Sequence, residues 1–307
     1  MFYYNAYGLN IRSEIPLPEL RRNINYIRDV NIIYGDIDLS DEEFTDSNFG
    51  KNSKFRISGK GLHFILDDIY ICRISFGKEI VINPDTGFDE SFLRAIILGP
   101  ALSFLLHQRG NLILHASAVN INNEAIAFIG KNGAGKSTIL CALHNEGYPI
   151  ITDDSLPIIY NDEYLPIVTP TYSRLKLRND VMEYLHGNLD STLKTHIYSE
   201  KYSYSADDNF SYKELYLKKI YIIEKGERTG FNSLNHMESL MKLIESSYCY
   251  EIFNKNDLAE NMLKCSKIVS NVPIKVLKVK HSLSQLSELS KIIENDNLNL
   301  IREGLVH

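Results

Sequence analysis

The sequence lacks any closely spaced pair of cysteines, although structural zinc sites and dithiol redox sites require such pairs. Its four cysteines are scattered along the chain: Cys72, Cys141, Cys249 and Cys265. We therefore expect reduced thiols in the protein core and no zinc or redox site built on them. Tryptophan is absent as well, and nothing about function follows from that.

Long apolar runs and an excess of positive charge are also missing. No segment approaches the ~18 uninterrupted apolar residues of a membrane helix, and residues 1–5 lack the basic and apolar stretches of a targeting signal. These absences predict a cytoplasmic protein that does not bind a membrane. The sequence contains 33 Lys and Arg and 39 Asp and Glu, which gives a net charge of -6. The overall charge therefore does not favour binding to nucleic acid either.

The 307 residues, 44% hydrophobic and 23% charged, are typical of a globular protein with one large or two modest domains. Residues 1–86 contain short strand-like runs separated by glycine and aspartate turns, which predicts antiparallel hairpins. A turn at residues 84–87 precedes an acidic start and an apolar helix that reaches His107. We predict a smaller β-rich N-terminal domain over residues 1–87 and a second domain over residues 88–307.

The second part changes to the order strand, strand, glycine-rich loop, helix and strand, which indicates an α/β domain with a central sheet. The two strands are expected at residues 112–119 and 124–129, with Asn122 and Asn123 as the turn between them. Further along, apolar spacing predicts the following elements. We expect helices at 179–185, 237–250 and 283–293, a strand at 215–224, and a polar loop at 205–209 that is either a lid or a plain exposed loop.

Residues 130–137 match the phosphate-binding pattern G-x-x-x-x-G-K-[ST] in full, between an apolar strand and a helix-forming run. Glycines allow the amide groups of such a loop to point at anionic oxygens, and the next helix adds its positive N-terminal end. Lys136 should reach the terminal phosphates and Ser137 should hold Mg²⁺. The residues expected to bind ATP are Gly130, Asn132, Gly133, Ala134, Gly135, Lys136, Ser137 and Thr138.

Two adjacent aspartates, Asp153 and Asp154, follow an early returning strand at residues 148–152. In a parallel sheet, a strand-helix-strand unit brings the ends of its two strands together, so both carboxylates should reach the loop. We assign Asp154 to the metal and Asp153 to the proton of an incoming hydroxyl, although the reverse order is open. The alternative is a turn in which both face solvent.

Other charged residues accompany this group. His115, on the strand before the loop strand, either orients the base or is a buried core histidine. Arg174, Lys176 and Arg178 alternate, so an extended stretch would place them on one face, either beside the phosphoryl group or in solvent.

The run from His115 to Val119, the complete loop and the return to Asp154 together resemble the HPr kinase/phosphorylase superfamily over roughly residues 111–156. The resemblance implies an α/β P-loop kinase domain related to phosphoenolpyruvate carboxykinase. It implies that Asp153 is the general base toward a substrate serine and that His115 contacts it. Relatives in that superfamily form hexamers, so it also implies a homo-oligomer.

Two departures limit the resemblance. Residues 170–177 contain no counterpart of the metal-linked glutamate of the bifunctional enzymes, and no C-terminal glycine- and arginine-rich signature is present. Residues 7–20 resemble HPr-kinase-like proteins of peptide biosynthetic clusters, some of which phosphorylate the C-terminal serine of lasso-peptide precursors. This resemblance makes such a peptide the leading acceptor.

Three functions remain open from the sequence. The first is an ATP- and Mg²⁺-dependent serine kinase acting on a peptide or protein, with Lys136, His115 and Asp153 as its catalytic residues. The second is a kinase for a small molecule such as an amino acid or a sugar. The third is a nucleotide-dependent ATPase or switch that transfers phosphate only to water.

Overall fold

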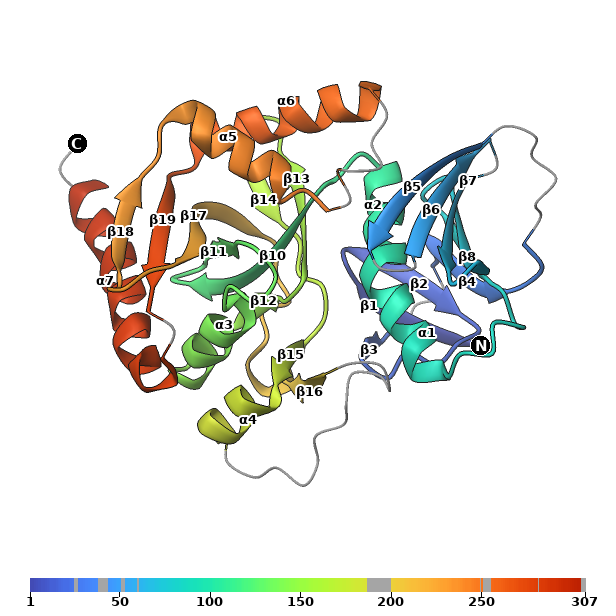
Figure 1. Cartoon of the computed structure of the whole chain (residues 1–307), viewed down its shortest axis with the longest axis horizontal. Coiled ribbons are helices and arrows are strands. Elements are labelled where there is room, and N and C mark those ends of the chain that lie inside the picture. Colours follow the sequence, from blue (N-terminus) through green and yellow to red (C-terminus); the bar gives the residue numbers. More distant parts are fainter. Residues whose placement is uncertain are drawn as a thin grey trace.

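The computed structural model describes residues 1–24, 27–37, 44–50, 53–59, 61–186, 200–248, 250, 255–280 and 282–304. The chain is a mixed α/β protein with two large sheets, one at each end of the molecule in Figure 1. Of the four cysteines, Cys72, Cys141 and Cys265 are buried and form no disulfide bond among the described residues. Cys249 lies outside the described residues.

The first sheet contains nine strands in the order β3-β1-β2-β4-β9-β8-β7-β6-β5. The strands β6 to β8 form successive antiparallel hairpins, as expected where turn residues separate short β-branched and aromatic stretches. The strands are β1 (Phe2–Ala6), β2 (Leu9–Ser13), β3 (Arg21–Arg22), β4 (Val30–Tyr34), β5 (Phe44–Gly50), β6 (Ser53–Ser58), β7 (Gly61–Leu66), β8 (Ile69–Ser75) and β9 (Glu79–Ile82).

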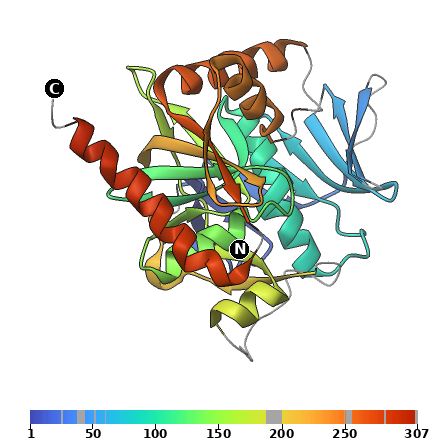
Figure 2. The ribbon, with the colours of Figure 1, turned by 60° about the vertical axis from the view of Figure 1, so that its left-hand side comes forward.

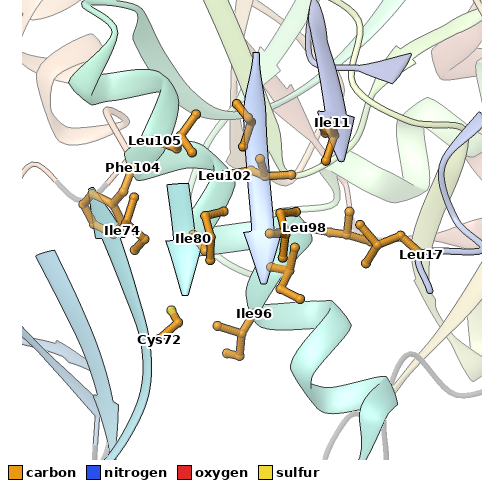
Figure 3. Close-up of a cluster of buried hydrophobic side chains, with 14 of the residues drawn as sticks. Ile11, Leu17, Cys72, Ile74, Ile80, Ile96, Leu98, Leu102, Phe104 and Leu105 are labelled. Atoms are coloured by element: carbon orange, nitrogen blue, oxygen red, sulfur yellow. The ribbon is translucent and has the colours of Figure 1, made fainter. Parts of the chain in front are cut away.

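One long helical stretch covers this sheet. It consists of α1 (Glu90–Ile96), a π-helical turn η1 (Ile97–Ala101) and α2 (Leu102–Gln108). Pro100 lies inside the π-helical turn, where the missing amide hydrogen of proline disturbs regular helix bonding. The apolar side of the stretch packs on the sheet, and Figure 3 shows Leu102 and Phe104 among these contacts.

Within the described residues, Glu90–Gln108 is long and apolar enough to cross a membrane by length and composition alone. Its most apolar window is 61% buried inside the protein. Because its buried side chains share a core with the N-terminal sheet, the apolar character of this stretch has a packing role there. The boundary expected between residues 87 and 88 precedes this helix and remains a prediction.

The second sheet has the strand order β11-β10-β13-β14-β17-β19-β18, with β12 paired to β10 and β11 also paired to β17. A separate hairpin pairs β15 with β16. The strands are β10 (Leu112–Ile121), β11 (Glu124–Ile129), β12 (Ile150–Thr152), β13 (Ser155–Tyr160), β14 (Pro166–Val168), β15 (Arg174–Arg178), β16 (Lys201–Ser205), β17 (Leu215–Lys225), β18 (Gly230–Ser233) and β19 (Ile274–Val279).

Helices cover both faces of this sheet, as Figures 1 and 2 show. Alternate residues of a strand point to opposite faces, so Ala127 packs toward α5 and α6 while Phe128 packs toward α3 and α7. The helices are α3 (Lys136–Asn145), α4 (Asn179–His186), α5 (His236–Glu245), α6 (Lys255–Asn271) and α7 (Leu286–Gly304), with short 3₁₀ turns η2 (Asp207–Asn209) and η4 (Leu283–Gln285). The helix predicted to reach residue 250 therefore ends at Glu245.

The strand β10 lies between β11 and β12, and it pairs antiparallel with both. The returning strand therefore does not lie directly beside the loop strand. Both strands run antiparallel to β10, so their C-terminal ends lie at the same end of β10, one on each side of it. The glycine-rich loop leaves the end of β11, and the aspartate pair leaves the end of β12.

Candidate nucleotide-binding and catalytic site

The glycine-rich loop connects β11 to α3, as the sequence pattern predicts. Gly130 has a φ of +150°, and a Cβ there would lie 2.8 Å from the carbonyl oxygen of Ile223. Only glycine fits this approach of two backbones. Gly135 forms the N-cap of α3, so the helix begins at Lys136 with its free amide groups at the loop.

Lys136 is buried, with 8% of its surface exposed. Its Nζ donates to the carbonyl oxygens of Gly130 at 2.7 Å and Lys131 at 3.4 Å. Burial lowers the pKa of Lys136, and the charges of Asp153 and Asp154 act in the opposite direction. The ammonium group is thus held at the loop and close to both carboxylates.

Strand pairing fixes the position of the two aspartates. The strand β12 pairs with β10 up to Thr152, and β13 resumes the pairing at Ser155 opposite His115. Asp153 and Asp154 therefore form a break between two strands that pair with the same edge of β10. Asp154 has a φ of +90°, an uncommon conformation for a residue other than glycine.

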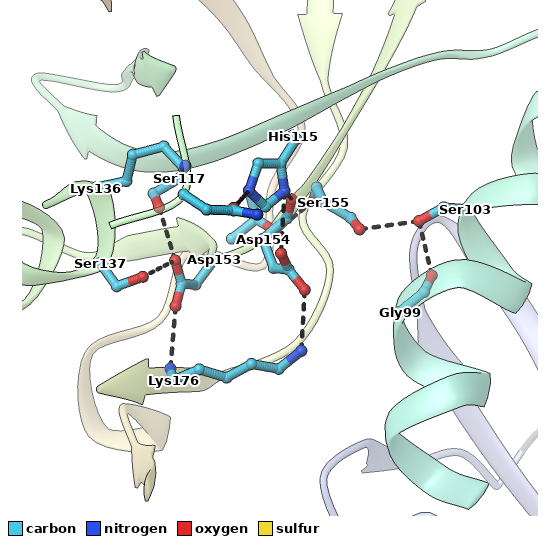
Figure 4. Close-up of polar contacts among 12 residues, drawn as sticks. Gly99, Ser103, His115, Ser117, Lys136, Ser137, Asp153, Asp154, Ser155 and Lys176 are labelled. Carbon is cyan, nitrogen blue, oxygen red and sulfur yellow. Dashed lines mark hydrogen bonds and ion pairs between the residues drawn. The ribbon is translucent and has the colours of Figure 1, made fainter. Parts of the chain in front are cut away.

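Asp153 is 4% exposed and accepts three hydrogen bonds. The hydroxyls of Ser117 and Ser137 donate to its Oδ1 at 2.7 and 2.9 Å, and the amide nitrogen of Lys176 donates to its Oδ2 at 3.0 Å (Figure 4). These donors fix the orientation of the carboxylate. Ser137, the residue expected to hold Mg²⁺, thus contacts Asp153.

Asp154 lies between two basic side chains. Lys176 Nζ is 3.0 Å from its Oδ2, and His115 Nδ1 is 3.1 Å from its Oδ1 (Figure 4). Burial alone would raise the pKa of Asp154, but the charge of Lys176 and the hydrogen bond from His115 hold that pKa well below its usual range. His115 Nε2 lies 3.0 Å from Asn132 Oδ1 on the loop, so the histidine joins the loop to the carboxylate.

These groups line one cavity of about 410 Å³, a volume within the usual range for ligand pockets. All the residues expected at the site line this cavity, except that Gly130 contributes only the carbonyl that holds Lys136. At the other end, Leu283, Leu286 and Leu289 form an apolar wall. The lining contains five cationic residues and three carboxylates: Lys136, Lys176, Arg178, Lys201, Lys280, Asp153, Asp154 and Asp180. The lining therefore carries a formal charge of +2, which suits a polyanion.

Two contributions were not identified from the sequence. Ser117 follows His115 by two positions on β10 and so shares its face, a signal that could have identified it as a partner of Asp153. Ser103 Oγ lies 2.9 Å from Ser155 Oγ and donates to Gly99 O at 2.8 Å. The first contact connects α2 to Ser155, the residue after Asp154 (Figure 4). No local pattern signals that contact.

Lys176 was identified only as one of three alternating cations. On β15 the three side chains do share a face, and Arg174 lies 4.0 Å from Asp207 while Arg178 pairs with Asp180 at 3.2 Å. Lys176 alone of the three contacts an aspartate of the pair.

The structure was searched for clusters of metal-ligating side chains over its described ranges. No group of three or more His, Cys, Asp or Glu capable of holding a metal ion occurs there. A magnesium ion bound together with a nucleotide does not require such a cluster, because it is usually held by one or two carboxylates and the substrate phosphates.

Among comparisons with known proteins, only the comparison with solved structures found a similarity, and the example described here is distant. No family model matches the chain, and no curated protein sequence matches it. Among solved structures, the Hpr(Ser) kinase/phosphatase from Coxiella burnetii is similar with a TM-score of 0.38 and 11% sequence identity. The similar region covers 64% of this chain and 96% of that one. A likeness this distant leaves family and function to be argued from the site itself.

Proposed function

We propose that this protein is an ATP- and Mg²⁺-dependent kinase that transfers a phosphoryl group to a hydroxyl of a peptide or protein. One observation carries the proposal: Lys136 and Ser137 of the glycine-rich loop share a cavity with the paired aspartates Asp153 and Asp154. The loop supplies the elements that hold a triphosphate. The carboxylates supply the groups that hold a metal and accept a proton.

The donors in this cavity fit magnesium. The Ser137 hydroxyl and the carboxylates of Asp153 and Asp154 offer the hard oxygen ligands that Mg²⁺ prefers. When bound, the ion would neutralise negative charge on the phosphates. Lys136 would add a second positive charge near the transferred group, and the amides of the loop would orient it.

In the proposed reaction, the acceptor hydroxyl oxygen forms a bond to the γ-phosphorus while the bond to the β,γ-bridging oxygen breaks, so ADP leaves. The hydroxyl proton passes to an aspartate. The contacts favour the reverse of the division predicted from the sequence: Asp153 contacts Ser137, and Asp154 contacts His115. We therefore propose that Asp153 supports the ion and that Asp154 with His115 orients the hydroxyl and receives its proton. The lowered pKa of Asp154 makes it a weak base. A weak base is sufficient when the transition state is loose, because the rate of phosphoryl transfer then depends mainly on how the reacting groups are positioned.

The nature of the acceptor rests on resemblance in the sequence. Residues 7–20 resemble kinases that modify lasso-peptide precursors, so a C-terminal serine of such a precursor is the proposed acceptor. In the test, the purified protein is incubated with γ-labelled ATP, Mg²⁺ and three acceptors: a serine-terminated peptide, free amino acids, and sugars.

We expect the label on the peptide hydroxyl, with transfer strongly reduced in Asp153→Asn and Asp154→Asn. Label on free amino acids or sugars would instead identify a small-molecule kinase. Release of labelled inorganic phosphate only, undiminished by Asp153→Asn, would identify an ATPase or switch and overturn the proposal.

A further inference from the structure

The apolar wall of the cavity around the glycine-rich loop belongs to the segment that follows β19. The strand β19 runs parallel to β17, and β17 runs parallel to β11, so the C-terminal ends of all three strands lie at one edge of the sheet. The segment after β19 therefore emerges two strands away from the glycine-rich loop, or ~10 Å at the usual strand spacing. Ligands of open α/β sheets bind at this edge.

The apolar wall differs in chemistry from the rest of the cavity. Leu286 and Leu289 are 7% and 3% exposed, while Leu283 is only partly buried and packs on the same core cluster. Val279 extends the wall at the end of β19. Apolar side chains offer nothing to a phosphate chain, but they gain from contact with an apolar part of the same ligand.

The helix α7, which contributes two of these leucines, is held firmly against the domain. Asp296 on α7 accepts hydrogen bonds from Lys219 at 2.8 Å and from Lys275 at 2.6 Å. Glu294 on the same helix accepts one from the hydroxyl of Tyr148 at 2.7 Å. The wall is therefore formed before a ligand arrives, which lowers the ordering cost of binding.

The polar groups of this segment are already engaged within the protein. The carbonyl oxygen of Val279 accepts from the amide of Gly226 at 3.0 Å, and that of Lys280 accepts from the amide of Ser282 at 2.8 Å. The hydroxyl of Ser282 lies 2.7 Å from that of Ser284. The described part of the segment thus presents mainly apolar side chains to the cavity.

Side chains that could read the edge of a nucleobase are scarce in the described lining. Asn132 is the one amide side chain there, and its Oδ1 lies 3.0 Å from His115 Nε2. Asp180 pairs with Arg178 at 3.2 Å. Adenine and guanine differ in the donors and acceptors at their ring edges, and strong discrimination between them requires groups dedicated to those positions.

We infer that the apolar wall binds the nucleobase of the phosphoryl donor through the faces of its ring and does not distinguish adenine from guanine. The inference rests on the proposed kinase function and widens its donor from ATP to purine nucleoside triphosphates. A purine covers more apolar surface than a pyrimidine, and a ligand without a base covers none. The expected order of affinity is ATP and GTP, then CTP and UTP, then ribose 5-triphosphate.

A binding measurement tests this order without requiring catalysis. The purified protein is titrated with each ligand in the presence of Mg²⁺ in a calorimeter. We expect the Kd values of ATP and GTP to agree within about fivefold, and ribose 5-triphosphate to bind at least about tenfold more weakly than ATP, or about 1.4 kcal/mol. Equal affinity for ATP and ribose 5-triphosphate overturns the inference, because the base then contributes nothing. A difference beyond fivefold between ATP and GTP overturns it as well.

A substitution in the wall locates the effect. Leu283→Ser removes a partly exposed apolar side chain, so ATP and GTP should each bind at least about fivefold more weakly, while the affinity for ribose 5-triphosphate stays within about twofold. That retained affinity also shows that the variant is folded. Leu258→Ser makes the same change at an exposed position on α6, outside the cavity, and should bind all ligands as the parent does. Undiminished ATP affinity in Leu283→Ser, or an equal loss for ribose 5-triphosphate, overturns the inference.

Transfer from labelled ATP and GTP to the serine-terminated peptide gives the second readout. The kcat/KM values of the two donors should agree within about fivefold. Gln285 has a buried Oε1 without a hydrogen-bond partner among the described residues, but it does not line the cavity, so Gln285→Ala should leave the ratio of the two values unchanged. A changed ratio would identify Gln285 as a reader of the ring edge and overturn the inference. Base-dependent binding without transfer to any acceptor retains the nucleobase site and overturns the kinase.

Discussion

The Ser137 hydroxyl donates a hydrogen bond to Asp153 Oδ1 at 2.9 Å. This contact joins the first turn of the helix α3 to the residue that follows the strand β12. It places the hydroxyl expected to hold Mg²⁺ beside one specific carboxylate of the pair. The roles of the two aspartates can therefore be separated by experiment.

The first prediction concerns metal dependence. We expect Asp153→Asn to raise the Mg²⁺ concentration for half-maximal activity by about tenfold or more, since about 1.4 kcal/mol of ion affinity corresponds to a factor of ten. Asp154→Asn should change this concentration less and reduce the maximal rate more, because its partners are His115 and Lys176. Titrating Mg²⁺ at saturating ATP measures both effects. If Asp154→Asn raises the Mg²⁺ concentration for half-maximal activity more than Asp153→Asn does, Asp154 supports the metal, as expected from the sequence.

The second prediction concerns the loop lysine. Lys136→Ala should lose at least ~3 kcal/mol of transition-state stabilisation, about a hundredfold in rate, because the loop carbonyls of Gly130 and Lys131 hold its ammonium group where the phosphates would bind. Single-turnover transfer from labelled ATP measures the loss. Lys131→Ala, an exposed position in the same loop, is the matched control and should retain most of the activity. Near-normal turnover of Lys136→Ala would refute the role assigned to this residue.

The third prediction concerns pH and the pair Lys176–Asp154. The folded pKa of Asp154 lies below the ~3.9 of an unfolded aspartate, so the pair stabilises the fold fully above about pH 5 and loses this effect as the pH falls through the lower folded value. Lys176→Met should lower the free energy of unfolding by about 2 kcal/mol at neutral pH. This loss lies between the ~1 kcal/mol that an exposed ion pair contributes to stability and the ~3–5 kcal/mol that is lost when one partner of a buried ion pair is removed.

Urea unfolding of the parent and of Lys176→Met at several pH values tests this. The difference between them should be constant from about pH 7 to pH 5 and should shrink below about pH 4. Lys213→Met removes a lysine at an exposed position and should show little difference at any pH. A difference for Lys176→Met that does not change on acidification would contradict the assignment.

The fourth prediction concerns the C-terminal helix α7. Asp296 on this helix accepts hydrogen bonds from Lys219 at 2.8 Å, Lys275 at 2.6 Å and Tyr221 at 2.6 Å, and the Lys219 side chain is fully buried. Asp296→Ala leaves this ammonium without its carboxylate, so we expect a loss of about 3–5 kcal/mol in the free energy of unfolding.

Two further variants control for the loss of charge at Asp296. Glu288→Ala, exposed on the same helix, should be almost neutral in the same denaturation experiment. The double variant Asp296→Leu with Lys219→Met removes both charges and should recover much of the stability. If the double variant is as unstable as Asp296→Ala, packing and not the unpaired charge causes the loss.

Local signals predicted the elements that carry the site. The glycine-rich loop, the strand before it and the returning strand follow from spacing, and Asn122 and Asn123 have the positive φ values of a tight turn. The β-rich character of residues 1–86 and the helix after Asp89 also follow from turn residues and a capping aspartate. These features depend on neighbours in the sequence.

Features that depend on distant partners were not predictable in this way. The sequence does not show that β10 separates β11 from β12, because strand order depends on packing of the whole sheet. The pairing of β15 with β16 joins residues 174–178 to residues 201–205, and the positive φ of Asp154 has no glycine to signal it. For the same reason, the contact of Lys176 with Asp154 was not predicted from the sequence.

The ladder along β10 has a practical consequence for protein engineering. His115 and Ser117 face the aspartates because Ala118 pairs with Thr152 and His115 pairs with Ser155. A slip of this pairing by one residue would turn both side chains to the opposite face. Grafting the glycine-rich loop with the Asp153–Asp154 dipeptide onto another scaffold would therefore not transfer the arrangement. The smallest portable unit is the block of strands β10 to β13 with α3, together with β15, whose Lys176 contacts both aspartates.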